Sequence, residues 1–366
     1  MPDRGPRAPG GAYTTMKGVV FLGERELALR EFPDPAPGPG DVVLAIKASG
    51  MCGSDLHPYR ASRSGNVAAA LGLGGQRGPV IGGHEPCGVV AARGPGVPEA
   101  AAPIGARVMN HHYKGCGACK HCRLGWSQLC PHGIVVYGMT GHGGHAPFML
   151  APARTLVPLP DELSFEEGAA ISCGTGTAYQ ALCRLDVSGR DTLAVFGQGP
   201  VGLSATMLGV AMGARVVAID VGSERREFGR QFGADAVVDP GATDVVAALK
   251  AFTDGEGVDA ALDCSGQPDA RLAAVRATRT WGRVGFVGEG NQVTFDVSPD
   301  LLRRQLTLHA SWTFSTLIQE ECARFIVRRQ VPLARLLTHR FRLAEATDAY
   351  RLFDTQTTGK GVFVFD

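Results

Sequence analysis

Four cysteines stand close together in the segment CGACKHCRLGWSQLC, at Cys116, Cys119, Cys122 and Cys130. Two chemistries use such a cluster: a knot of disulfides or a closed metal site. The spacing C-x2-C-x2-C-x7-C is too tight for unstrained disulfides, whereas a zinc ion accepts four thiolates from short loops. The cluster therefore predicts a structural zinc. Because all four coordination positions are filled, this zinc stabilises its own lobe and performs no chemistry.

Three glycines in the stretch TLAVFGQGPVGLSA form a second motif. Gly197, Gly199 and Gly202 make the pattern G-x-G-x-x-G directly after a strand-like run, and Pro200 and Val201 open a helix-like one. The first glycine permits a tight turn, the second lets a pyrophosphate approach the backbone, and the third lets helix and strand pack closely. In isolation the pattern is compatible with an ordinary tight turn. Its place between a strand and a helix predicts a dinucleotide site at the helix N-terminus.

The acid that ends the next strand-like run, ARVVAID, indicates which dinucleotide binds. Asp220 follows the glycine motif at the expected spacing of about 20 residues. Its carboxylate is suited to accept hydrogen bonds from the adenosine ribose hydroxyls and to repel a 2′-phosphate, which favours NAD over NADP. Arg225 and Arg226 stand close by, and either could pair with such a phosphate. NADP therefore stays open as the less favoured cofactor.

A third group of reactive side chains lies in three further stretches, GMCGSDLHPY, GGHEPCGVV and ISCGTGTAY. The group comprises Cys52, Ser54, Asp55, His57, His84, Glu85, Cys173 and Thr177. Each member alone has an ordinary explanation, since Cys173 could be a buried core cysteine, Asp55 a turn residue and His57 a surface histidine. The combination with the two motifs above is what makes the group informative.

Together these stretches resemble a zinc-dependent alcohol dehydrogenase of the medium-chain dehydrogenase/reductase family, over nearly the whole chain from Met16 onward. The resemblance implies a catalytic zinc held by Cys52, His84 and Cys173, with the fourth position left for water or substrate. It also implies that Asp55 orients the histidine ligand. Glu85 matches an acid beside the zinc that can bind it transiently.

The same resemblance assigns further residues to the reaction. Ser54 and His57 resemble a relay that carries the alcohol proton to water. Thr177 matches a position beside the nicotinamide ring, and Lys360 matches a basic residue on the pyrophosphate. His112 lies where relatives carry an aromatic residue in the substrate cleft, and an imidazole there favours a substrate with a second polar group. His112 could instead support the adjacent structural zinc lobe.

The pattern of predicted secondary structure changes near residue 174. With 366 residues, the chain is long enough for two domains. Short β-like runs precede this point, whereas strand-like and helix-like segments alternate after it, which is typical of βαβ units. The predicted class is α/β. The resemblance implies a GroES-like β-rich catalytic domain over residues 1–174, with residues 1–15 disordered, and a Rossmann domain over 175–314. The segment 315–366 would return to the catalytic domain.

Composition excludes several other functions. With 36 Lys and Arg against 35 Asp and Glu, the chain has no basic footprint for nucleic acid. No apolar run is long enough for a membrane span, and the N-terminus lacks a secretory signal, so we expect a cytoplasmic protein. We predict two zinc ions, NAD, an alcohol or carbonyl substrate such as a polyol, sugar-derived or amino alcohol, and a homodimer or homotetramer. A zinc-free quinone or enone reductase and a non-catalytic zinc- and nucleotide-binding protein remain as alternatives.

Overall fold

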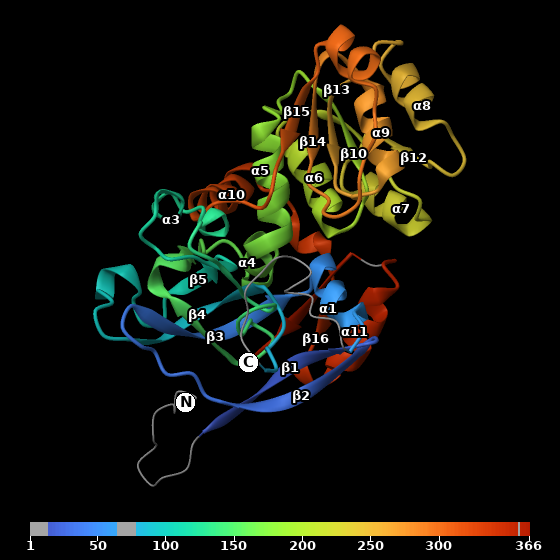
Figure 1. The fold of residues 1–366 in the computed structure, drawn as a ribbon. Helices are drawn as coiled ribbons and strands as arrows, with labels where there is room; N and C mark the ends of the chain where they lie inside the picture. Colours follow the sequence, from blue (N-terminus) through green and yellow to red (C-terminus); the bar gives the residue numbers. More distant parts are fainter. Residues whose placement is uncertain (1–13, 64–77, 358) are drawn as a thin grey trace.

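The computed structural model describes residues 14–63, 78–357 and 359–366, which fold into two lobes (Figure 1). One lobe is built around a mostly antiparallel sheet and the other around a parallel one. The extension expected over residues 1–15 lies outside the described residues up to residue 13, and Thr15 already begins the first strand. None of the described helices is long and apolar enough to cross a membrane.

The first lobe contains a seven-stranded sheet with the order β16-β17-β3-β4-β5-β9, in which β8 also pairs with β3. Its strands are β3 (Asp41–Gly50), β4 (Glu85–Arg93), β5 (Arg107–Asn110), β8 (Phe148–Pro152), β9 (Leu156–Pro158), β16 (Leu337–Phe341) and β17 (Lys360–Val364). Two short pairs complete this lobe: β1 (Thr15–Gly23) with β2 (Glu26–Pro33), and β6 (Tyr113–Lys114) with β7 (Val135–Val136). The predicted β-rich domain is confirmed.

The second lobe contains six parallel strands in the order β12-β11-β10-β13-β14-β15. Its strands are β10 (Thr192–Phe196), β11 (Arg215–Ile219), β12 (Ala236–Val238), β13 (Val258–Asp263), β14 (Thr278–Phe286) and β15 (Thr307–Ala310). Its helices are α6 (Pro200–Ala211), α7 (Ser223–Gln231), α8 (Val245–Phe252) and α9 (Pro268–Ala277). The strand order reverses between β10 and β13, and open α/β sheets bind ligands at such a point, beyond the carboxyl ends of the strands.

Helices cover both faces of this parallel sheet, because its strands are apolar on both sides. Leu193 and Val195 of β10 pack into a core that includes residues of α5 (Gly176–Arg184) and α6. Ala194 and Phe196 face a second core formed with α8 and α9. All five residues of β10 are buried. This pattern is typical of a doubly wound sheet, and it confirms the predicted Rossmann architecture.

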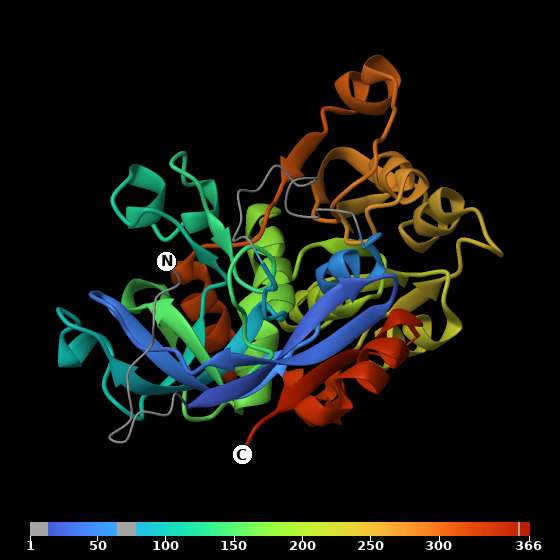
Figure 2. The same ribbon diagram turned by 60° about the horizontal axis from the view of Figure 1, so that its bottom comes forward.

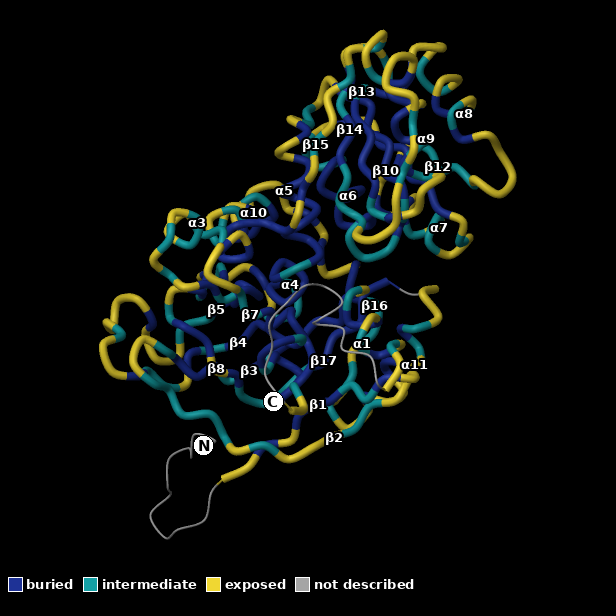
Figure 3. The backbone as a smooth tube through the Cα atoms, viewed as in Figure 1, coloured by how far each residue is buried: buried dark blue, intermediate teal, exposed yellow. Residues whose placement is uncertain are grey.

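A continuous helical stretch joins the two lobes. It consists of α4 (Phe165–Ala170), a π-helical turn (Ile171–Thr175) and α5 (Gly176–Arg184). The boundary expected at residue 174 falls inside this stretch rather than in a loop. One apolar core runs through the junction, from Ala48 of β3 and Cys87 of β4 to Leu193 of β10. The buried backbone in Figure 3 follows both sheets, whereas exposed segments lie in the outer loops.

The end of the chain returns to the first lobe. After β15 the chain forms α10 (Thr316–Arg329) and α11 (Ala346–Asp354), and β17 pairs antiparallel with β3. Figure 2 shows the red segment that contains α11 beside the blue N-terminal strands β1 and β2. The described part of this lobe also contains two short α-helices, α1 (Leu56–Arg60) and α3 (Lys120–Arg123). Residues from opposite ends of the sequence therefore share one sheet.

Candidate active site

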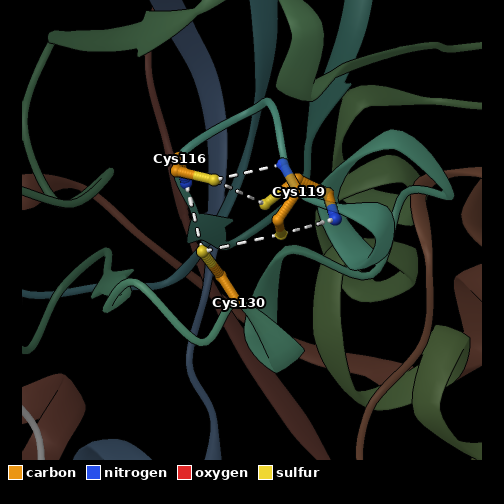
Figure 4. A group of neighbouring side chains, drawn as sticks. Cys116, Cys119 and Cys130 are labelled. Carbon is orange, nitrogen blue, oxygen red and sulfur yellow. Dashed lines mark hydrogen bonds between the residues drawn. The ribbon is translucent and has the colours of Figure 1, made fainter.

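The four cysteines of segment 116–130 converge in space. Their Sγ atoms lie within 4.8 Å of one another, with 4.0 Å between Cys116 and Cys122 and 3.9 Å between Cys119 and Cys130. Zn–S bonds of about 2.3 Å would place tetrahedral sulfur ligands about 3.8 Å apart. Figure 4 shows Cys116, Cys119 and Cys130 with their sulfur atoms turned toward a common point. All ten cysteines of the chain are free, and this group fits a closed zinc site.

Backbone N–H groups support these sulfur atoms. The amide of Cys119 donates to Cys116 Sγ over 3.3 Å, and the amide of Cys116 donates to Cys130 Sγ over 3.4 Å. Helix α3 begins directly after Cys119, whose Sγ accepts a hydrogen bond from the amide of Cys122. Such N–H groups favour the thiolate form, which is the form that binds metal.

A second group of metal-binding side chains forms where β3, β4 and the joining helix meet. Cys52 follows β3 and precedes a single 3-10 turn, and His84 immediately precedes β4. Cys173 is the middle residue of the π-helical turn between α4 and α5. A π-helical turn in an otherwise α-helical stretch is uncommon and often marks a functional site. Here the turn carries the third thiol.

The geometry of this second group fits a metal ion. Ligand atoms of Cys52, His84, Glu85 and Cys173 all lie within 4.8 Å of one another, and the two Sγ atoms are 3.9 Å apart. His84 Nδ1 donates to Asp55 Oδ1 over 2.8 Å, because a carboxylate oxygen accepts only. The imidazole is thereby fixed with Nε2 as the metal-binding atom. Three thiol and imidazole donors around one point are a zinc-type ligand set.

The two relay candidates occupy different environments. Ser54 Oγ lies 3.1 Å from His84 Nε2 and 3.4 Å from Cys52 Sγ, so the hydroxyl is beside the metal-binding atoms. His57 lies three residues further on, at the solvent-exposed side of α1. The structure thus places Ser54 inside the site and His57 at the surface nearby, which is the order that an outward proton relay requires.

Glu85 and Lys360 form a buried ion pair next to the metal ligands. Lys360 Nζ lies 2.5 Å from Glu85 Oε2 and donates to the carbonyl of Met51 over 3.1 Å, and both charged side chains are almost fully buried. Burial raises the pKa of Glu85 to about 8, although the ammonium of Lys360 opposes the shift. Lys360 therefore contacts Glu85 rather than open solvent, and its predicted contact with a cofactor phosphate stays a prediction.

The glycine motif adopts the geometry that each glycine permits. Gly197 has φ +86°, and a side chain there would collide with Ser265. A Cβ on Gly202 would lie 1.7 Å from the carbonyl oxygen of Gly197, so only glycine lets α6 approach the turn this closely. A Cβ on Gly199 would meet nothing within 4 Å. The second glycine thus faces open space at the N-terminus of α6, where Pro200 is the first helical residue.

Asp220 and its two arginine neighbours lie beyond the end of β11. The Asp220 carboxylate accepts from the amides of Gln198 and Gly222 over 2.6 and 2.8 Å, and its oxygens retain further lone pairs for ribose hydroxyls. Arg226 pairs with Asp239 over 2.8 Å and donates to two backbone carbonyls. Arg225 differs, because its buried Nε has no hydrogen-bond partner among the described residues.

The nucleotide motif and the metal ligands are direct neighbours. Gly174 follows Cys173, and a Cβ on it would lie 3.7 Å from Val201 in α6 and 3.8 Å from Lys360 Nζ. The hydroxyls of Thr175 and Ser204 of α6 are 2.9 Å apart, which ties the two helices together. Thr177 lies one turn beyond Cys173 and is buried. A dinucleotide on the glycine loop would therefore end next to the metal site.

Comparison with known proteins identifies the family. Residues 38–161 match the model of the alcohol dehydrogenase GroES-like domain, and residues 200–328 match that of the zinc-binding dehydrogenase. The chain is 40% identical to the uncharacterized zinc-type alcohol dehydrogenase-like protein YphC of Escherichia coli, over 96% of this chain and 99% of that protein. The chain belongs to the zinc-type alcohol dehydrogenases. This confirms the resemblance to the medium-chain dehydrogenase/reductase family.

Two further proteins are similar to this zinc-type dehydrogenase over most of its length. The L-threonine 3-dehydrogenase of Pyrococcus horikoshii is 31% identical over 92% of this chain and 94% of its own. Among solved structures, the alcohol dehydrogenase TADH from Thermus sp. ATN1 has a TM-score of 0.84 at 29% identity, over 95% of this chain and 99% of its own. These likenesses extend over both lobes.

In the dehydrogenase, His112 lies beside His84, one of the candidate metal ligands. Its ring centroid is 5.6 Å from that of His84, and the side chain is almost fully buried. Nδ1 lies 2.7 Å from the carbonyl oxygen of Ser172, which only accepts, so Nδ1 carries the proton and Nε2 is left as an acceptor. Burial lowers the pKa of His112 well below its usual value, so the ring is neutral.

A row of rings continues outward from His112. Tyr113 follows at 4.3 Å between ring centroids, and Trp312 lies 5.7 Å from Tyr113. The Trp312 indole is 42% exposed and donates from Nε1 to the exposed carboxylate of Glu289 over 2.5 Å. We call these four residues the ring wall. It leads from the metal ligands toward solvent and ends in a carboxylate.

Sequence reasoning missed three members of the ring wall, although a signal for two of them existed. Glu289 follows the end of β14 by three residues, and Trp312 follows the end of β15 by two. Residues just beyond the carboxyl ends of parallel strands lie at the ligand edge of such a sheet. Tyr113 directly follows His112 but has no pattern of its own. The rule for strand ends could have found the first two.

Proposed function

We propose that the chain is a dehydrogenase that transfers a hydride between an alcohol and NAD, with one catalytic and one structural zinc per chain. The observation that carries this proposal is the proximity of Gly174, the residue after Cys173, to Val201 of the nucleotide motif, since a Cβ on Gly174 would lie 3.7 Å from Val201. A cofactor whose pyrophosphate lies on the glycine loop would reach the metal-bound substrate with its far end. A structural or regulatory nucleotide would need no such contact.

The residues of this chain have separable roles in that reaction. Zinc held by Cys52, His84 and Cys173 supplies a Lewis acid that lowers the pKa of a bound alcohol hydroxyl. Ser54 would take up the hydroxyl proton as it gives its own proton to the nicotinamide ribose, and His57 would accept the proton from the ribose and release it to water. Asp55 holds the imidazole of His84 in the tautomer that binds metal.

NAD is the cofactor that the described charges favour. Asp220 presents its carboxylate beyond β11, where the adenosine ribose binds in this fold. Arg226 is engaged by Asp239 and two carbonyl groups, so it is not free to pair with a 2′-phosphate. Of the two arginines, Arg225 is the one left to pair with a 2′-phosphate, and it lies beside Asp220, whose negative charge would repel that phosphate.

The ring wall favours a substrate with a second polar group. His112 offers an acceptor, and Glu289 offers a negative charge further out. A polyol, sugar-derived alcohol or amino alcohol would satisfy these groups, whereas a simple aliphatic alcohol would leave the imidazole unpaired. A relative named L-threonine 3-dehydrogenase is in keeping with an amino alcohol.

A metal analysis combined with two variants tests the proposal. We expect two zinc ions per chain and NAD-dependent oxidation of a polyol or amino alcohol. Cys52→Ser should abolish turnover and leave one zinc in a folded chain, whereas Cys119→Ser should lose the other zinc and mainly lower thermal stability. A single zinc in the wild type, or turnover of enones without metal, would contradict the proposal.

A further inference from the structure

A chain of buried polar side chains leads away from the catalytic metal ligand His84. It starts at Asp55, whose second oxygen, Oδ2, lies 3.2 Å from the Tyr350 hydroxyl. His145 Nε2 lies 2.7 Å from the same hydroxyl, and His145 Nδ1 lies 2.8 Å from Ser49 Oγ. The exposed fraction of each of these residues is 2% or less. This row of hydrogen bonds thus connects the proposed metal ligand to Tyr350, His145 and Ser49, to which the proposed reaction assigns no role.

The direction of every hydrogen bond follows from Asp55, because an ionised carboxylate only accepts. Tyr350 must donate its single hydroxyl hydrogen to Asp55. His145 must then donate from Nε2 to the Tyr350 oxygen, which leaves Nδ1 to accept from the hydroxyl of Ser49. Burial lowers the pKa of His145 to about 4, in keeping with a neutral ring. With one tautomer of each histidine, every hydrogen bond in this row has one donor and one acceptor.

We propose that Tyr350 and His145 are positioning residues for the catalytic metal, which act on His84 through Asp55. The Tyr350 hydroxyl shares Asp55 Oδ2 with the amide of Cys52, which donates to it over 2.9 Å. The two donors together fix the plane of the Asp55 carboxylate, and that plane fixes the imidazole of His84. This inference rests on the proposed metal site. It extends the site to helix α11, nearly 270 residues from His84 along the sequence.

The surroundings of His145 make this arrangement rigid. A Cβ on Gly83, the residue before His84, would lie 2.2 Å from His145 Nδ1, so the imidazole rests directly on the backbone that carries the ligand. The amide of His145 donates to the carbonyl of Gly82 over 3.0 Å. Phe363 of β17 contacts the other side of the ring, with centroids 4.7 Å apart. Neither His145 nor Tyr350 has room to turn away.

Zinc retention by the holoenzyme tests the proposal without relying on turnover. Native mass spectrometry would count zinc ions per chain during incubation with a chelator. Partners beyond the first shell typically change metal affinity roughly 10- to 100-fold. We expect Tyr350→Phe to release the catalytic zinc on the order of tenfold faster than the wild type. His145→Phe should have a smaller effect and Ser49→Ala the smallest, while retention of the structural zinc stays unchanged.

Tyr59→Phe is the matched control. Tyr59 is also buried, its ring lies 5.6 Å from that of Tyr350, and among the described residues it takes no part in the chain of hydrogen bonds. Equal zinc retention in Tyr350→Phe, Tyr59→Phe and wild type would overturn the inference. So would an effect that does not decline from Tyr350 to Ser49. If Tyr350→Phe fails to fold, His145→Phe and Ser49→Ala decide the matter. A wild type with one zinc would instead remove the proposed function.

Discussion

A single hydrogen bond decides what His112 presents to a substrate. Because its Nδ1 donates to Ser172, Nε2 is an acceptor, and burial keeps the ring uncharged. We therefore expect His112→Phe to lower kcat/KM for a polyol or amino alcohol by about 1–3 kcal/mol of transition-state stabilisation, since a substrate hydroxyl loses its partner. Simple aliphatic alcohols should be unharmed. Steady-state kinetics with matched substrates measure the difference.

The same variant also distinguishes the alternative role of His112. If the imidazole mainly supported the cysteine lobe, His112→Phe would lower activity with both kinds of alcohol and reduce the zinc content. The ring of His112 lies 5.6 Å from that of His84, which favours a role at the candidate metal site.

Asp220 is the residue on which cofactor preference depends. Asp220→Asn removes the charge beside Arg225 and keeps one carbonyl oxygen. Because Gln198 and Gly222 donate to different oxygens of the carboxylate, one of these two amides loses its acceptor. We expect the ratio of kcat/KM for NADP over NAD to rise roughly tenfold, which corresponds to about 1.4 kcal/mol. Arg225→Ala in the same background should abolish the gain. A wild type that already prefers NADP would contradict the reasoning.

At the scale of elements, two glycines in the turn between β10 and α6 are expected to differ in role, with Gly202 needed for stability and Gly199 for cofactor binding. Gly202→Ala would force Cβ against the Gly197 carbonyl, so the helix must move and the protein should be destabilised. Gly199→Ala meets open space at φ −71°, which alanine adopts without strain. We expect Gly199→Ala to leave the melting temperature unchanged but to weaken NADH binding, because the methyl group occupies the place of the pyrophosphate.

Fluorescence titration with NADH and a thermal melt of each variant check this contrast. Equal loss of binding and stability in both variants would show that the turn responds as one unit, and that the second glycine has no separate role.

The elements differ in how much of them the sequence could predict. The glycine motif, the cysteine lobe and the alternation of strands and helices are local patterns, and each was predicted from neighbouring residues. The π-helical turn at Cys173 was not, because a π-helical turn has the composition of the helices around it. The domain boundary expected at residue 174 lies within this turn, and it stays a prediction.

On the scale of the whole molecule, the contacts that complete the metal site were hardest to predict. Tyr350 meets Asp55, and Lys360 meets Glu85, across nearly the full length of the chain. Neither Tyr350 nor His145 belongs to a motif of its own in the sequence, so nothing local indicates that the two side chains meet near Asp55. Such pairs become visible only when β17 joins β3 and α11 packs beside α1.

The Lys360–Glu85 pair gives a prediction that belongs to the folded molecule as a whole. Lys360→Met leaves the Glu85 carboxylate buried without its cation, and breaking a buried pair on one side typically costs about 3–5 kcal/mol. Urea unfolding of the zinc-loaded protein should show a loss of this order. The double variant Glu85→Gln, Lys360→Met removes both charges, so it should recover much of the stability. If the double variant is as unstable as Lys360→Met, the loss does not come from the unpaired charge of Glu85. The C-terminal strand would then be anchored to the metal site by its backbone pairing with β3 rather than by this charge pair.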